Sequence, residues 1–172
     1  MNMIKKIITL IFCIQISLTN AFAVCPVLQT MSTESVEKEL KEHILSSDVH
    51  WNHTLIGFVI SVENKMLFDE CNCLTEDGKS FLNKLAQIMK NSGRQWKIYA
   101  HTEHGATQLD RLYTTSKQAG EVTNYLTNIE RCLINQIFPI GFGSIMPYQK
   151  HNPDHITNER TDFIIEEFNF NR

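Results

Sequence analysis

The chain has 172 residues, with 16 lysines and arginines against 19 aspartates and glutamates, and a formal net charge of −3. Hydrophobic residues make up 42% of it, which is enough for one domain with a buried core. Because the chain is acidic and has no basic cluster, nucleic acid is not expected as a partner, nor is charge-driven binding to anionic lipid.

The N-terminus predicts a secretory signal peptide over residues 1–23. Lys5 and Lys6 precede an apolar run over Ile7–Leu18, and Ala21-Phe22-Ala23 has the small-x-small pattern of a cleavage site. The run is too short for a membrane span, and a retained anchor helix is the alternative. Cleavage removes two of the 16 basic residues and no acidic one, so the mature chain has 14 against 19.

The cysteines leave two questions open. Phe22-Ala23-Val24-Cys25 resembles a bacterial lipobox, and if it is one, Cys25 is the first mature residue and carries lipid. An exported chain meets an oxidising compartment, so disulfides are expected among Cys25, Cys71, Cys73 and Cys132, with the pairing undecided. Cys71-Asn72-Cys73 has the wrong spacing for a zinc knuckle and lacks a second pair.

Apolar periodicity predicts the elements in chain order. Helices are expected over Thr33–Ser46, from Thr75 to about Asn91, and from about Gln108 to Ile129. Strands are expected over Thr54–Phe68 with a turn near Glu63-Asn64-Lys65, and over Gln95–His101, Gln136–Ile140 and Arg160–Phe168. Loops are expected over Asp48–His53 and Met146–Pro153.

This order, β-α-β-α-β-β, predicts an α+β sandwich in which two helices pack on one mixed sheet. Residues 24–53 are expected to form an N-terminal leader with a short helix, and residues 54–172 a single domain.

The segment His101-Thr102-Glu103-His104 follows a predicted strand and offers two histidines and a carboxylate. Nothing in the sequence fixes a third ligand beside them, and the helical His-Glu-x-x-His spacing of zinc proteases is absent. No Gly-x-Ser-x-Gly motif occurs, and no cysteine has a nearby histidine in a helix-terminus context. We therefore expect no metal, no cofactor and no enzymatic activity. His101 as a strand-end residue and Glu103 as a solvated acid remain the simpler interpretations.

Several short motifs, in chain order, resemble OmpA-like peptidoglycan-binding domains. Tyr99-Ala100-His101-Thr102-Glu103 resembles the Gly-His-Thr-Asp stretch of that family. Leu74-Thr75-Glu76 with Leu82-x-x-Leu85-Ala86 resembles the family's first helix. Ile140-Gly141-Phe142-Gly143-x-x-x-Pro147 resembles its Gly-Tyr-Gly-x-x-x-Pro turn, and Asn158-Glu159-Arg160 resembles the Asn-Arg-Arg before its last strand. The resemblance covers about Met66–Phe168.

The resemblance implies a pocket for the diaminopimelate of a peptidoglycan stem peptide. A carboxylate suits the ammonium of diaminopimelate, and an arginine suits its carboxylate. The implied ligand-binding residues are Glu103, Gln118, Arg160, Asn158, Arg111 and Asp69. Glu103 replaces the family aspartate, and Gln118 replaces the family arginine if the alignment has no gap. A gap of one residue would select Lys117 instead, but it would also turn polar side chains into the core.

The resemblance implies a non-enzymatic cell-envelope protein that tethers to peptidoglycan in the periplasm, with outer-membrane anchoring if Cys25 is lipidated. The rival hypothesis is an OmpA-like fold that has lost peptidoglycan binding. Such a protein would act as a protein–protein subunit of an envelope-spanning complex such as a type IVB secretion system. The missing arginine at Gln118 and the non-standard Glu103 are the features that separate the two.

Overall fold

The computed structural model describes residues 30–166 except 45, 133, 148–149 and 151–157. The predicted signal peptide and Cys25 lie outside the described residues, as does most of the expected loop Met146–Pro153. Within the described part of the chain, no helix is long and apolar enough to cross a membrane.

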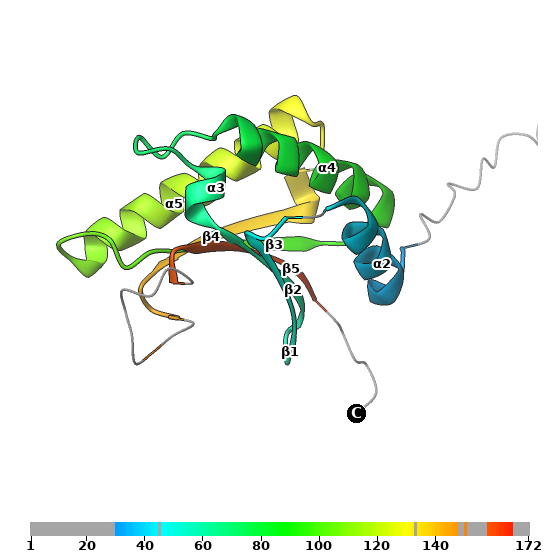
Figure 1. Cartoon of the computed structure of the whole chain (residues 1–172), viewed down its shortest axis with the longest axis horizontal. Coiled ribbons are helices and arrows are strands. Elements are labelled where there is room, and N and C mark those ends of the chain that lie inside the picture. The colour runs from blue at the N-terminus through cyan, green and yellow to red at the C-terminus, as the bar shows by residue number, and fades with distance from the viewer. Residues whose placement is uncertain (1–29, 45, 133, 148–149, 151–157, 167–172) are drawn as a thin grey trace, which may run out of the picture.

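The described chain alternates helices with the strands of one sheet (Figure 1). The helices are α2 (Thr33–His43), α3 (Asn64–Leu67), α4 (Glu76–Ser92) and α5 (Gln108–Asn124), the last continued by a π-helical turn over Tyr125–Ile129. The strands are β1 (Val49–Thr54), β2 (Gly57–Glu63), β3 (Trp96–His101), β4 (Ile137–Gly143) and β5 (Arg160–Glu166).

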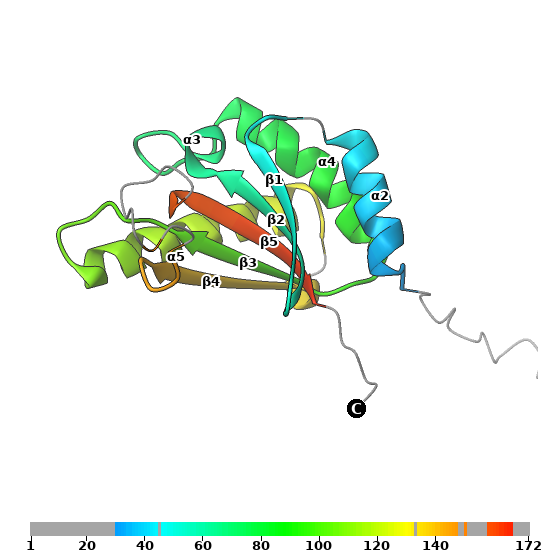
Figure 2. The same ribbon diagram turned by 60° about the horizontal axis from the view of Figure 1, so that its bottom comes forward.

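The five strands form a mixed sheet in the order β1-β2-β5-β3-β4, which can be followed in Figure 2. Only β3 and β4 are parallel among these neighbours, and the last strand, β5, lies in the centre between β2 and β3. The predicted fold class, α+β with helices packed on one mixed sheet, is confirmed.

The core lies between one face of the sheet and the helices. Strand residues alternate between two faces, so Trp96 and Ile98 of β3 share a face with their partners Ile165 and Phe163 of β5. All four are fully buried. Phe81 of α4 packs its ring against Phe163, with ring centroids 5.6 Å apart. Ala119 and Val122 of α5 complete this layer, as the predicted helical face required.

Local signals fix the ends of the two long helices. The Thr75 hydroxyl accepts a hydrogen bond from the Gly78 N–H at 2.9 Å, and Gly93 ends α4 in the left-handed conformation at φ 62°. Thr107 and Asp110 form a reciprocal capping box at the start of α5. The predicted start of α4 is confirmed, as is that of α5.

Two predicted elements are wrong. Asp48–His53, expected to be a loop, contains most of β1, which pairs with β2 in register Val49↔Val62. Trp51 then stacks on Phe58 at 6.0 Å, which gives this polar stretch an apolar face. The end of the strand expected over Thr54–Phe68 is instead the helical turn α3, because the chain turns at Asn64 to leave the sheet.

Gly141 and Gly143 follow the strand expected over Gln136–Ile140, but in the structure they lie within β4. A Cβ on Gly141 would come within 2.4 Å of the Ser116 backbone nitrogen, so this glycine allows α5 to lie directly on β4. Gly143 adopts φ 54°, a left-handed conformation that favours glycine. The motif therefore sets the distance between α5 and the edge of the sheet.

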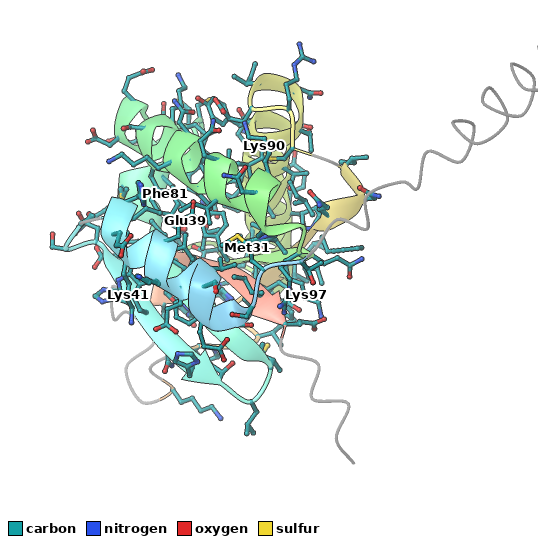
Figure 3. The ribbon with its side chains drawn as sticks, turned by 90° about the vertical axis from the view of Figure 1, so that its right-hand side faces the viewer. Met31, Glu39, Lys41, Phe81, Lys90 and Lys97 are labelled. Carbon is teal, nitrogen blue, oxygen red and sulfur yellow. The ribbon has the colours of Figure 1, made fainter. Side chains whose placement is uncertain are left out.

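The N-terminal helix α2 shares the core of the rest of the domain. Figure 3 looks onto this side and shows α2 beside α4. Val36 and Leu40 are fully buried, and the Met31 N–H donates to the Ser92 carbonyl at 2.9 Å. The segment expected to be a leader thus contributes both a helix and a strand to this fold.

We predict that Leu40→Ala lowers the free energy of unfolding by about 2–5 kcal/mol, because it opens a cavity in a closed core. Lys38→Ala, on the exposed side of the same helix, is the control and should change stability by about 0.5 kcal/mol or less. Urea denaturation measures both. Equal stability of the two variants would mean that α2 is not part of the folded domain.

Candidate functional site

The loop that follows β3 is held from two sides. On one side the Glu159 carboxylate accepts hydrogen bonds from the Thr102 hydroxyl at 2.7 Å and from the Glu103 N–H. On the other side Arg111 Nε donates to the Glu103 carbonyl at 3.0 Å, and its Nη1 donates to Ser144 Oγ at 3.3 Å. Glu159 immediately precedes β5 and Arg111 lies in the first turns of α5, so the loop bridges the two elements.

A cavity of about 270 Å³ opens beside this loop. Its wall is formed by the end of β2, α3, the 69–73 turn, the loop after β3, α5 and the segment just before β5. The lining residues are Glu63, Asn64, Lys65, Phe68, Asp69, Asn72, His104, Gln118 and Glu159. Of the six predicted ligand-binding residues, Asp69 and Gln118 therefore line this cavity.

Gln118 is buried, with 5% of its surface exposed. Its Nε2 donates to Asn72 Oδ1 at 2.8 Å, while its Oε1 has no hydrogen-bond partner in the described residues. The neighbouring Lys117 lies outside, where its Nζ donates to the Cys71 carbonyl at 3.1 Å. Gln118, which the ungapped alignment selects, therefore lines the cavity, and Lys117 is not among the lining residues.

Asp69 organises its own turn. Its Oδ1 accepts the backbone N–H groups of Cys71 and Cys73, both at 2.9 Å, in the manner of an Asx turn. Asn72, between the two cysteines, adopts φ 57°. Asp69 thus shapes the wall of the cavity, and its carboxylate is already engaged on one oxygen.

The cavity carries more acidic than basic groups. Glu63, Asp69 and Glu159 line it, against Lys65 and the titratable His104. Lys65 Nζ lies 2.7 Å from the Glu63 carboxylate. No arginine is among the described residues that line it. Arg111 and Lys117 are not among the lining residues, and they bond to backbone or hydroxyl oxygens.

Arg160 lies on the sheet face opposite the helices, together with Asp162. Its Nε lies 3.1 Å from both oxygens of Asp162, which also accepts the Ser61 hydroxyl at 2.6 Å. Arg160 lines a second cavity, of about 370 Å³, with residues of β1 and β2 such as His50 and Ser61. The structure therefore separates Arg160 from Gln118, whereas Asn158, 1% exposed, is buried just before β5.

His101 completes the group around Asp162. Its ring stacks on Phe142 with centroids 5.4 Å apart, and its Nε2 lies 3.2 Å from Asp162 Oδ2. Burial lowers the pKa of His101 and outweighs the nearby Asp162. Burial alone would raise the pKa of Asp162, but the contact with His101 and the charge of Arg160 hold it below its ordinary value. His101 is thus a buried strand-end residue, the simpler interpretation.

Sequence reasoning did not select seven of the nine residues that line the cavity, among them the charged Glu159 and Lys65. Glu159 stands in the middle of the Asn158-Glu159-Arg160 motif, where the resembling family has an arginine, and this charge reversal was the available signal. Lys65 was read only as part of a turn, because its position beside the cavity depends on α3. In the described part of the chain, no group of three or more His, Cys, Asp or Glu side chains is placed to hold a metal ion.

Comparison with known proteins decides the family. The model of the OmpA family matches residues 71–161, more than half of the chain. The chain belongs to the OmpA family. This membership agrees with the mixed sheet and with the loop after β3, and the match includes the lining residues Asn72, His104, Gln118 and Glu159.

Solved structures share this OmpA fold at low sequence identity. The cell wall anchor of the T6SS from Pseudomonas aeruginosa matches with a TM-score of 0.61 and 15% identity, covering 77% of this chain and 97% of that one. The periplasmic domain of Helicobacter pylori MotB matches with a TM-score of 0.59 and 15% identity, covering 70% of this chain and 82% of that one. The peptidoglycan-associated lipoprotein from Burkholderia pseudomallei matches with a TM-score of 0.50 and 20% identity, covering 59% of this chain and 88% of that one. A search of curated proteins found no matching relative.

We predict that stability falls as the pH drops below about 6.5, in part through His101. Its pKa is lower in the folded than in the unfolded chain, so the unfolded chain binds more protons in this range and acid favours unfolding. His101→Gln should reduce the difference in melting temperature between pH 7.5 and 5.5. His104→Gln, whose side chain is 87% exposed, should leave this difference unchanged. If His101→Gln leaves this difference in melting temperature unchanged, the lowered pKa of His101 does not contribute to the loss of stability in acid.

Proposed function

We propose that this protein is a non-enzymatic component of the cell envelope that associates with peptidoglycan through its OmpA-family domain. The observation that carries the proposal is the cavity of about 270 Å³ at the junction of the 69–73 turn, α5 and the loop after β3. The resemblance assigns the stem-peptide pocket to these same segments. The similarity to a cell wall anchor and to a peptidoglycan-associated lipoprotein supports the association with peptidoglycan.

In this proposal the ligand is the diaminopimelate end of a stem peptide. Glu159 and Asp69 give the cavity the negative charge that attracts an ammonium group, and a hydrogen bond to a charged group contributes about 1.5–3 kcal/mol. Lys65 is the lining cation available to the carboxylate, in place of the family arginine. Lysine offers a point charge without the bidentate geometry of arginine, so we expect weaker binding than with an arginine.

The protein acts in the periplasm under this proposal. The predicted signal peptide over residues 1–23 provides export, and lipid on Cys25 would add an anchor in the outer membrane. The tether would join the cell wall to an envelope protein complex.

The second candidate function is that of a protein–protein subunit that has lost peptidoglycan binding, in an envelope-spanning complex such as a type IVB secretion system. One observation favours it. The side chain at the arginine position, Gln118, bonds to Asn72 inside the wall and brings no charge to the cavity. Binding of a zwitterionic ligand is the property that separates the two functions.

We predict that the mature protein co-sediments with purified sacculi and that free diaminopimelate releases it. The competitor should act because it occupies the same cavity as the stem peptide. Lysine, which keeps the second ammonium but lacks the carboxylate on the same carbon, is the control competitor and should release less protein. Protein that stays in the supernatant, or sediments equally with and without diaminopimelate, would support the second function.

We further predict that Glu103→Asp combined with Gln118→Arg raises affinity for a diaminopimelate-containing stem peptide by roughly ten- to a hundredfold. The arginine would supply a bidentate contact to the ligand carboxylate, worth about 1.5–3 kcal/mol. Lys117→Arg is the matched control, because Lys117 lies one position away and outside the cavity. Calorimetric titration measures all three proteins. A gain only in Lys117→Arg would shift the alignment by one residue, and no binding in any would favour the second function.

A further inference from the structure

We propose that Cys71 and Cys73 form a reversible disulfide with each other, which makes the 69–73 turn a thiol–disulfide site on the wall of the cavity. Both cysteines are exposed and free. The sequence left the pairing of four cysteines open, and the geometry of this turn selects one pair.

Backbone conformation brings the two cysteines together. Asn72 lies between them at φ 57°, and for a residue other than glycine this value is compatible only with the left-handed helical region. A residue in that region places the flanking Cα atoms roughly 5.4 Å apart, by the mirror image of α-helical geometry. Disulfides need a Cα separation of about 4.4–6.8 Å. The turn therefore holds Cys71 and Cys73 at bridging distance.

Hydrogen bonds hold the turn in this shape. The N–H groups of Cys71 and Cys73 both donate to Asp69 Oδ1 at 2.9 Å, so the two nitrogens lie no farther apart than twice that distance. Cys73 Sγ lies 4.0 Å from the Cys71 carbonyl oxygen, which places this sulfur on the side of Cys71.

The third described cysteine is no competitor for this bridge. Cys132 is buried, with its Sγ 3.9 Å from the Ala86 carbonyl oxygen in α4. Burial raises the pKa of its thiol and keeps it from attacking a disulfide. Cys71 and Cys73 are thus the accessible thiols among the described residues.

The chemistry requires an oxidant that itself carries a disulfide, such as oxidised glutathione or a protein disulfide. The thiolate of one cysteine attacks this disulfide, and one thiol of the oxidant leaves. The thiolate of the second cysteine attacks the resulting mixed disulfide and releases the other thiol. The pair loses two electrons and two protons, and the oxidant gains them as two thiols.

The bridge would stiffen the wall that holds α5. Asn72 Oδ1 accepts from Gln118, and the Cys71 carbonyl accepts from Lys117, so the turn makes contacts with two consecutive residues of α5. A disulfide across Asn72 restricts the conformations that this turn can adopt when its bonds to Gln118 and Lys117 are broken. The redox state of Cys71 and Cys73 is therefore coupled to Gln118, the residue that the ungapped alignment places at the family arginine.

The test uses the protein purified from cells, incubated with oxidised glutathione, quenched with N-ethylmaleimide and digested with trypsin. Cleavage after Lys65 and Lys79 releases one peptide that contains Cys71 and Cys73 and no other cysteine. We expect this peptide to be lighter by two hydrogens, free of maleimide and free of glutathione. After reduction it should take up two maleimides. Glutathione retained on either cysteine, two maleimides after oxidation, or a bridge to Cys25 or Cys132 would each overturn the proposal.

Two variants of Asn72 test the conformational argument. Asn72→Gly and Asn72→Val both remove the bond to Gln118, but only glycine adopts φ 57° without strain. We expect the ratio of bridged to reduced peptide, at a fixed glutathione redox ratio, to be roughly tenfold lower in Asn72→Val than in Asn72→Gly. Equal ratios would show that the turn does not preorganise the pair.

Discussion

The buried side-chain amide of Asn64 joins the three strands whose ends surround the cavity. Its Nδ2 donates to the His101 carbonyl at the end of β3, and its Oδ1 accepts the Thr161 hydroxyl of β5, both at 2.9 Å. Its backbone N–H donates to the Glu159 carbonyl. A buried amide must satisfy its donors and acceptors, so these bonds fix where β2 stops and where the segments after β3 and before β5 meet. The loop containing Glu103 and the carboxylate of Glu159 derive their positions from this junction.

Two residues within the OmpA-like motifs and helix make bonds that hold the wall of the cavity. Glu159 contributes a carboxylate that holds the loop after β3, and Gln118 contributes a neutral amide that holds the 69–73 turn. Arg160, on the other face of the sheet, pairs with the buried Asp162, and removing one partner of such a pair would cost about 3–5 kcal/mol. Residues that resemble ligand-binding residues are therefore used largely to stabilise the fold. The chain thus retains the family fold although its residues at these positions differ from the motifs that it resembles.

The sequence predicted the long helices, the four strands β2, β3, β4 and β5 and the OmpA resemblance, because their apolar periodicity and caps are local signals. It failed at β1, whose polar residues become a strand only by pairing with β2, and at α3, where Asn64 makes long-range bonds that no local pattern reveals. The helical face containing Ala119 was predicted, but the burial of Gln118 beside it was not, because it depends on the 69–73 turn, where Asn72 accepts from its amide. The role of Glu159 was not predicted either, because it depends on β5 lying beside β3. Long-range strand order was the information the sequence lacked.

A nuclear magnetic resonance titration with a diaminopimelate-containing stem peptide tests the central claim, that the cavity beside the loop after β3 is the ligand site. The account predicts shifts in the side-chain amides of Gln118, Asn72 and Asn64 and in the backbone amides of Glu103 and His104. The second cavity supplies the contrast, since His50, Asn52 and Ser61 should not move. Shifts confined to those three residues, or none at saturating peptide, would contradict the account.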